Sequence, residues 1–223
     1  MDTINHGEPE SGYIGSIESD CYVGSTFRDV EVLRTTKINI IARGRRYGRM
    51  WLLKGLREEY RDSTAMQRQL QKEFEIHSRL LHKSIVHIAG MEKVDGLGLC
   101  IVQEWVEGIT LAEAMQTGQI NSAERRRIIH ELTEAVAYIH SQGIVHRDLK
   151  PANVMIRDIG REIALIDFGL ADTSDYVEIK APAGTVGFIS PEQEDTGGAN
   201  PADDVYSLGI IMAELTPGYT AIA

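Results

Sequence analysis

The first half of the chain alternates short apolar runs with polar turns. Residues 29–33, 38–42 and 49–56 are β-prone, and the polar turns 34–37 and 45–48 separate them. Short runs bounded by turn residues are typical of strands in an antiparallel meander. Two more apolar runs flank Asp95 and Gly96, a pair that favours a hairpin turn. This half therefore predicts a small antiparallel sheet.

Residues 63–81 break the strand pattern and show helical spacing instead. Four large side chains recur every three or four positions, at Leu70, Phe74, His77 and Leu81. That spacing places them on one face of a helix. The sequence thus predicts one helix within the sheet-forming half.

The pattern becomes mostly helical after Gly108. Residues 121–140 open with Asn121 and Glu124 in the register of a capping box. An apolar stripe follows at helical spacing, formed by Ile128, Ile129, Leu132, Val136 and Ile139. A final helix is expected to begin near Asp204.

These patterns predict an α+β chain with two lobes. We expect a flexible N-terminal arm over residues 1–27, which are rich in Gly, Ser, Asp and Glu. A small antiparallel β lobe with one helix should occupy residues 28–104, and a mainly helical large lobe residues 105–223. The connector lies near Trp105, and ligand sites favour clefts between lobes.

Composition narrows the range of partners and compartments. The formal net charge of −10 argues against a nucleic-acid binder and against attraction to an anionic membrane. Two cysteines provide neither a disulfide framework nor a metal cluster, which suits a reducing compartment. The acidic N-terminus does not resemble a signal peptide, and no stretch has the length of a membrane span. We therefore expect a cytoplasmic protein with no membrane segment in this chain.

Residues 144–156, which read IVHRDLKPANVMI, set polar side chains inside an apolar frame. Buried charges need partners, so the frame indicates a rigid holder for a preorganised polar site. Asn153 and Asp167 lie at the edges of two apolar runs that can pair as a hairpin, and their oxygens suit a hard metal ion. Asp148 can orient a hydroxyl for attack on a phosphoryl group, and Lys150 can neutralise charge on the group transferred.

Five motifs in a fixed order extend this interpretation. They are HRDLKPAN at 146–153, DFG at 167–169, GTVGFISPEQ at 184–193 with the embedded SPE, and DDVYSLG at 203–209. In order and spacing they resemble eukaryotic-type Ser/Thr protein kinases, in the style of the bacterial branch. The resemblance implies a bilobal protein-kinase-like fold that transfers a phosphoryl group from ATP to Ser/Thr hydroxyls of protein substrates. It also implies Mg²⁺, with Mn²⁺ as an alternative ion.

The resemblance assigns roles to further residues. Lys54 should pair with the α- and β-phosphates of ATP, and Glu73 should be its ion-pair partner. Backbone groups of Glu104 and Val106 should bind adenine, and Met155 should form the floor of that pocket.

The glycine-rich loop of the family is missing. Arg34, Thr36 and Asn39 stand where glycines would let the backbone approach the phosphates closely. Side chains of Arg34 or Lys37 are therefore candidates to replace the lost backbone donors. The alternative is an ordinary hairpin turn that touches nothing.

Two substitutions and the length of the chain also depart from the family pattern. Leu52 replaces a small residue above the adenine, and His77 replaces an apolar residue of the small-lobe helix. We expect His77 to be neutral and to face Phe168. The family pattern continues beyond the last residues of this sequence, so the large lobe is expected to be incomplete at its C-terminus.

Three functions compete. The first is an ATP-dependent Ser/Thr protein kinase, because every chemical residue of the motifs is in place. The second is a catalytically weak or inactive kinase-like scaffold, which the altered loop, Leu52 and the short large lobe favour. The third is a small-molecule kinase of the same fold. Residues 184–193 argue against it, because they favour protein substrates.

Overall fold

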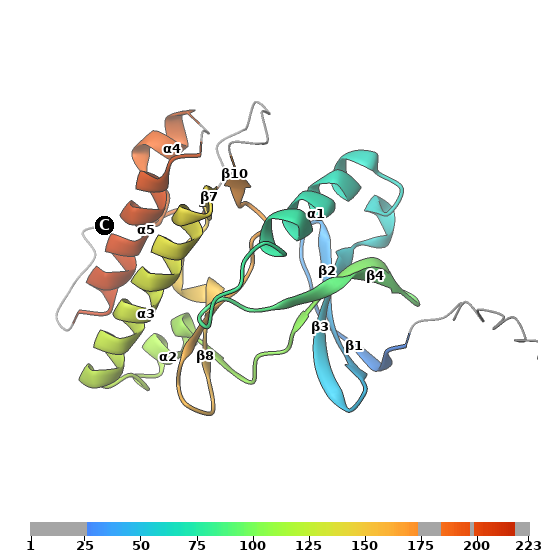
Figure 1. Ribbon diagram of the computed structural model, residues 1–223, viewed down its shortest axis with the longest axis horizontal. Helices are drawn as coiled ribbons and strands as arrows, with labels where there is room; N and C mark the ends of the chain where they lie inside the picture. The colour runs from blue at the N-terminus through green and yellow to red at the C-terminus, as the bar shows by residue number, and fades with distance from the viewer. Residues whose placement is uncertain (1–25, 174–183, 197–198, 217–223) are drawn as a thin grey trace, which may run out of the picture.

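The computed structural model describes residues 26–173, 184–196 and 199–216, and in it the chain forms two lobes (Figure 1). A five-stranded antiparallel sheet in the order β1-β2-β3-β5-β4 dominates the first lobe. Helix α1 (Thr64–His77) lies beside this sheet, and a short 3₁₀ turn (Glu58–Tyr60) precedes it. The strands are β1 (Arg28–Thr35), β2 (Asn39–Arg46), β3 (Arg49–Leu56), β4 (Ile88–Val94) and β5 (Gly98–Glu104).

The second lobe is mainly helical. Helices α3 and α5 lie side by side, and α2 contacts β6 and β8 of a three-stranded sheet in the order β6-β8-β9. The helices are α2 (Leu111–Gln116), α3 (Ser122–Ser141), α4 (Pro191–Thr196) and α5 (Pro201–Glu214). The short strands are β6 (Gly108–Thr110), β7 (Ile144–Val145), β8 (Val154–Arg157), β9 (Ile163–Leu165) and β10 (Asp172–Thr173), with a 3₁₀ turn at Pro151–Asn153. The predicted α+β bilobal class is therefore confirmed.

Side-chain caps explain where the long helices begin. Asn121 accepts hydrogen bonds from the backbone at Ala123 and Glu124, and the Glu124 carboxylate accepts one from the Asn121 backbone. This is the predicted capping box, which satisfies N–H groups that a helix start leaves open. Asn200 forms the same arrangement with Asp203, so α5 begins at Pro201, earlier than the sequence pattern indicated.

The end of α1 corrects one prediction. The helix ends at His77, and Leu81 is 79% exposed although the periodic pattern placed it on the buried face. The chain leaves the helix at Ser78, and the irregular segment that follows buries Leu80 instead. The Leu81 N–H is bonded to the Tyr138 hydroxyl of α3.

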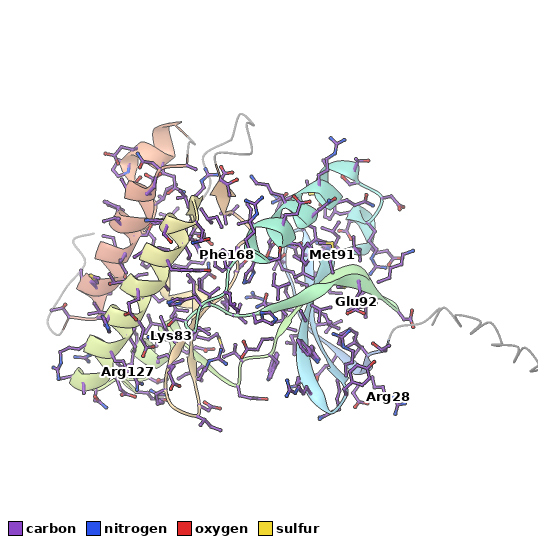
Figure 2. The ribbon with its side chains drawn as sticks, viewed as in Figure 1. Arg28, Lys83, Met91, Glu92, Arg127 and Phe168 are labelled. Atoms are coloured by element: carbon purple, nitrogen blue, oxygen red, sulfur yellow. The ribbon has the colours of Figure 1, made fainter. Side chains whose placement is uncertain are left out.

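Apolar clusters fill both lobes, and the cluster of the large lobe also includes Ile76 of α1. Phe27 is buried against the outer part of the small-lobe sheet, and the Arg46 guanidinium lies 4.5 Å from its ring centroid. Phe27 is therefore part of the small lobe and not of the arm predicted for residues 1–27. Of that predicted arm, Thr26 is exposed, and residues 1–25 lie outside the described residues. The α3 stripe is buried in the large-lobe core, where Phe168 also packs. Figure 2 shows Phe168 at the junction between the lobes.

Candidate active site

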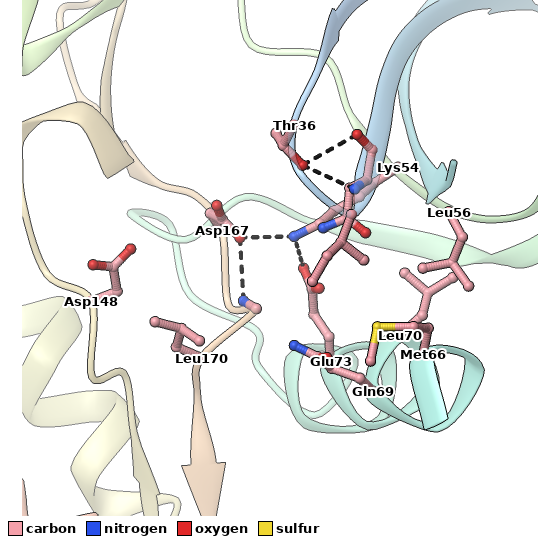
Figure 3. A pocket seen from close by; sticks show the side chains of 13 residues that line it. Thr36, Lys54, Leu56, Met66, Gln69, Leu70, Glu73, Asp148, Asp167 and Leu170 are labelled. Atoms are coloured by element: carbon pink, nitrogen blue, oxygen red, sulfur yellow. Dashed lines mark hydrogen bonds and ion pairs between the residues drawn. The ribbon is translucent and has the colours of Figure 1, made fainter. Parts of the chain in front are cut away.

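Lys54 of β3 joins three elements that are far apart in sequence. Its Nζ atom lies 2.6 Å from Glu73 Oε1 on α1 and 2.8 Å from Asp167 Oδ1 after β9 (Figure 3). Lys54 and Glu73 are both buried, at 7% exposure each. The structure therefore brings together the predicted Lys54–Glu73 pair and adds Asp167 to it.

The electrostatics of this cluster favour the charged forms of Lys54 and Asp167 despite burial. Burial alone would lower the pKa of Lys54, but the nearby carboxylates of Glu73 and Asp167 hold it above its usual range. Burial alone would raise the pKa of Asp167, but the Lys54 ammonium holds it well below its usual range. Burial raises the pKa of Glu73, and Lys54 opposes that shift. A positive charge thus faces the cavity between two carboxyl groups.

Asp148 is the centre of a second cluster on the large lobe. Its Oδ2 atom accepts hydrogen bonds from Lys150 Nζ at 2.7 Å and Asn153 Nδ2 at 3.1 Å. Its Oδ1 atom accepts one from the Thr185 hydroxyl at 2.6 Å, and Lys150 Nζ also lies 2.6 Å from that hydroxyl oxygen. The predicted catalytic pair is therefore held in one network, and a side-chain hydroxyl can reach the Asp148 carboxylate.

Asp204 fixes the backbone beneath Asp148. Its carboxylate is fully buried at the start of α5 and accepts 2.8 Å hydrogen bonds from the backbone N–H groups of His146 and Arg147. It also bonds His140 Nε2 at 2.9 Å. Arg147 has a φ of +67°, a strained value for a side chain of this size. The two bonds from Asp204 support that turn and set the direction in which Asp148 points.

A cavity of about 210 Å³ separates the two clusters. Lys54, Glu73, Asp148 and Asp167 line it, and Figure 3 shows Asp148 across the space from Asp167. The other lining residues are Thr36, Ile38, Asn39, Leu56, Met66, Gln69, Leu70, Gly169 and Leu170. Four of the predicted site residues therefore share one cavity.

Asn153 and Asp167 meet through the predicted hairpin. Strands β8 and β9 pair antiparallel, with Val154 opposite Leu165, and the Ile166 N–H donates to the Asn153 carbonyl at 2.9 Å. The Asn153 amide nitrogen is used by Asp148, so its amide oxygen remains as a donor atom for a metal. Within the described part of the chain, the hydrogen bonds of the Asp167 carboxylate use Oδ1, which leaves Oδ2 for the same role. Two hard oxygens suit Mg²⁺, so the residues present fit the expected ion.

The predicted adenine residues lie apart from this cavity. Glu104 uses its N–H for the His87 carbonyl, and its carboxylate pairs with Arg157 at 2.6 Å. Val106 is buried and belongs to an apolar cluster that includes the half-buried Met155. These three residues are not among those that line the cavity between the Lys54 and Asp148 clusters.

The loop that replaces the glycine-rich turn is a tight hairpin between β1 and β2. The Thr36 hydroxyl accepts from the Asn39 N–H at 2.9 Å, and the Thr36 N–H donates to the Asn39 carbonyl at 2.8 Å. No residue from 34 to 39 has a positive φ, so this turn needs no glycine. Thr36 and Asn39 line the cavity, whereas Lys37 is exposed and is not a lining residue.

His77 packs where the sequence places it. Its ring centroid lies 4.3 Å from that of Phe168, and Nε2 bonds the Val86 carbonyl at 2.8 Å. Burial lowers its pKa to about 4, so His77 is neutral at physiological pH, as expected. The His146 ring also packs against Phe168, and the two ring centroids lie 4.8 Å apart.

Several site residues were not predicted as such. Thr185 lies in the motif at residues 184–193, and its hydroxyl bonds Asp148 directly. Met66, Gln69 and Leu70 line the cavity from α1 together with Glu73. Their spacing of three, four and seven positions places them on one helix face, and this signal was available in the sequence.

Comparison with known proteins assigns the family. Residues 40–223 match the family model described as the protein kinase domain, so the chain belongs to the protein kinase domain family. The predicted family is therefore confirmed.

Several similar curated proteins are bacterial and are named serine/threonine-protein kinases. The chain is 35% identical over 170 residues to serine/threonine-protein kinase PrkC of Bacillus subtilis, an alignment that covers 74% of this chain and 26% of PrkC. It is 34% identical over 180 residues to a probable serine/threonine-protein kinase PknB of Corynebacterium glutamicum, covering 77% and 28% of the two chains. It is 35% identical over 147 residues to PknL of Mycobacterium tuberculosis, covering 64% and 36%. The chain thus spans about a quarter to a third of the length of these relatives.

A helix that spans a membrane must be both long and apolar. Among the described residues, no helix is both long enough and apolar enough to span a bilayer.

Proposed function

We propose that this domain transfers the γ-phosphoryl group of ATP to Ser or Thr hydroxyls of protein substrates. The observation that carries the proposal is the pairing of two preformed clusters across one cavity. Lys54 is held by Glu73 and Asp167 on one side, and Asp148 is held by Lys150 on the other. Phosphoryl transfer depends on such positioning and on charge stabilisation in the transition state.

Lys54 is the anion-binding group of the site. Its ammonium is fixed by two carboxyl groups and faces the cavity, so it can contact phosphate oxygens without a further search of rotamers. When bound, Mg²⁺–ATP supplies the phosphoryl group and a metal charge that offsets the phosphates. Asn153 and Asp167 would hold that ion through the oxygens described above.

Asp148 is the group that orients the acceptor. The Thr185 contact shows that a hydroxyl can donate to Asp148 Oδ1 at 2.6 Å. A substrate hydroxyl that takes the same position is aligned for attack, and its proton can pass to the carboxylate. Lys150 lies beside both groups and can stabilise negative charge that develops on the transferred phosphoryl group.

The proposal extends to the remaining expectations. We also propose a protein substrate, Mg²⁺ as the working ion and a cytoplasmic location, which the protein kinase family and the need for ATP support. The net charge of −10 supports the absence of nucleic acid as a partner. For the small-lobe loop, we propose that Arg34 and Lys37 reach the phosphates only after ATP enters. The hinge residues Glu104, Val106 and Met155 are proposed to hold the adenine.

The test is transfer of labelled phosphate from ATP by this chain and by the full-length protein, with Mg²⁺ and with Mn²⁺. A generic basic protein and the protein itself serve as acceptors, and phosphoamino-acid analysis identifies the residue modified. Label on Ser or Thr supports the proposal. ATP binding without transfer by either protein would instead support the kinase-like scaffold.

A further inference from the structure

Asp172 is a fully buried carboxylate close to, but outside, the catalytic clusters. It lies on β10, which pairs antiparallel with β7, and Asp172 is opposite Val145 in that register. Strand β7 leads directly into the turn that holds Asp148. A buried carboxylate is unfavourable unless cations and hydrogen bonds offset the loss of hydration. The neighbours of Asp172 therefore indicate how its charge is stabilised.

Two cations from different lobes approach this carboxylate. Lys72 Nζ of α1 lies 3.0 Å from Asp172 Oδ1, and Arg147 Nη1 of the catalytic loop lies 3.9 Å from Oδ2. The Thr173 N–H also donates to Oδ1 at 2.9 Å. Asp172 is thus an anion between a small-lobe cation and a large-lobe cation.

Each cation adjoins a residue of the proposed active site. Lys72 precedes Glu73, so on a helix its side chain points about 100° away from the Lys54 partner. Arg147 precedes Asp148, and its own backbone is fixed by Asp204 and by a hydrogen bond from Gln193 Nε2 to its carbonyl at 3.0 Å. A rotation or displacement of α1 that separates Glu73 from Lys54 would also move Lys72 relative to Asp172.

We propose that Asp172 is a positioning residue that couples the placement of α1 to the catalytic loop. It holds Lys72 on α1 while Glu73 holds Lys54, and its carboxylate attracts the Arg147 guanidinium from 3.9 Å, beside the turn that positions Asp148. The two clusters across the cavity are then aligned together. This inference rests on the proposed phosphoryl transfer, because the role given to Asp172 is to keep Lys54 and Asp148 aligned across the cavity.

The experiment is a double-mutant cycle with Lys72→Met, Asp172→Asn and the two combined. Lys83→Met is the matched control, because Lys83 also pairs with a carboxylate, Glu134, but at an exposed site with 69% of its side chain accessible. The measurements are kcat and KM for transfer, the Kd of Mg²⁺–ATP, and amide exchange in β7 and α1. Unfolding midpoints report the stability of every variant.

Coupling has a defined signature in this cycle. Each single variant should lower kcat by about tenfold, and the double variant should be no worse than Asp172→Asn, because both remove the same interaction. Asp172→Glu should restore part of kcat, and Lys83→Met should match the parent. Amide exchange should accelerate in both β7 and α1 of Lys72→Met, although that substitution lies only in α1.

Two results would overturn the inference. One is strictly additive losses in kcat and Kd. The other is a loss of stability in Asp172→Asn with unchanged kcat of the folded fraction. If Asp172→Asn does not fold, the test rests on Lys72→Met, because Lys72 is partly exposed and its substitution is better tolerated. Unchanged amide exchange in β7 of Lys72→Met then rejects the coupling. If the parent protein transfers no phosphate, the proposed function fails, and the cycle in Kd and exchange still tests the coupling.

Discussion

A fall in pH should destabilise this domain through His77. The side chain is 1% exposed, packs against Phe168 with ring centroids 4.3 Å apart, and bonds the Val86 carbonyl at 2.8 Å. Its pKa falls from an ordinary value of 6.5 to about 4 because burial disfavours the charged ring. The unfolded chain therefore binds a proton at a higher pH than the folded chain does.

The sign and size of the effect follow from this difference. The neutral ring contributes its full stability above the unfolded pKa of 6.5, and that contribution is lost as pH falls toward the folded pKa of about 4. Between about pH 7 and about pH 5 the loss amounts to about 2 kcal/mol, and its upper limit is about 3 kcal/mol. For a domain with about 5–15 kcal/mol of total stability, this is a large change.

The assay is urea unfolding of the parent and of His77→Met at several pH values between about 7 and about 5. Other groups titrate in both proteins, so the quantity of interest is the difference between their free energies of unfolding. We expect the parent to lose about 2 kcal/mol more than the variant over this range. Parallel pH profiles for the two proteins would refute a buried neutral His77.

Three further predictions concern the nucleotide site. Glu73→Gln should lower the transfer rate by about tenfold or more and should destabilise the fold by about 1–3 kcal/mol, because Lys54 loses one buried carboxylate but keeps Asp167. Kinetics and urea unfolding measure these two effects, and parent-like values for both would contradict the prediction. Asp167→Ala should abolish metal-dependent ATP binding, and a calorimetric titration with unchanged affinity in Mg²⁺ would exclude this carboxylate as the metal ligand. Arg34→Ala combined with Lys37→Ala should weaken ATP binding by roughly tenfold if these side chains replace the missing backbone donors. Parent-like affinity of this double variant would mean that the hairpin contributes no charge to the phosphates.

Local patterns and motif spacing were sufficient to predict most of the fold. The capping box of Asn121 and the Asp95–Gly96 hairpin depend on a few neighbouring residues, so the sequence contains the whole signal. The end of α1 was missed because it is decided by tertiary contacts. The turn after Ser78 buries Leu80 and exposes Leu81, although both residues fit an apolar helix face.

The site was predictable where a motif fixes both residue type and role. Lys54 with Glu73, and Asp148 with Lys150, lie together as predicted. The contacts of Asp172 were not predicted, because Lys72 is 100 residues away in sequence and no periodicity links the two. A single acidic residue after the DFG motif gives no local indication of its partners.

The central claim is that Asp148 orients an acceptor hydroxyl while Lys54 binds the phosphates. The most direct measurement compares the parent with Asp148→Asn for transfer of the labelled γ-phosphoryl group and for binding of Mg²⁺–ATP. The substitution keeps the shape of the side chain but removes the carboxylate charge that Lys150 and the Thr185 hydroxyl contact. We expect Asp148→Asn to lower transfer by at least about a hundredfold with nearly unchanged ATP affinity. Transfer at the parent rate by Asp148→Asn would contradict it.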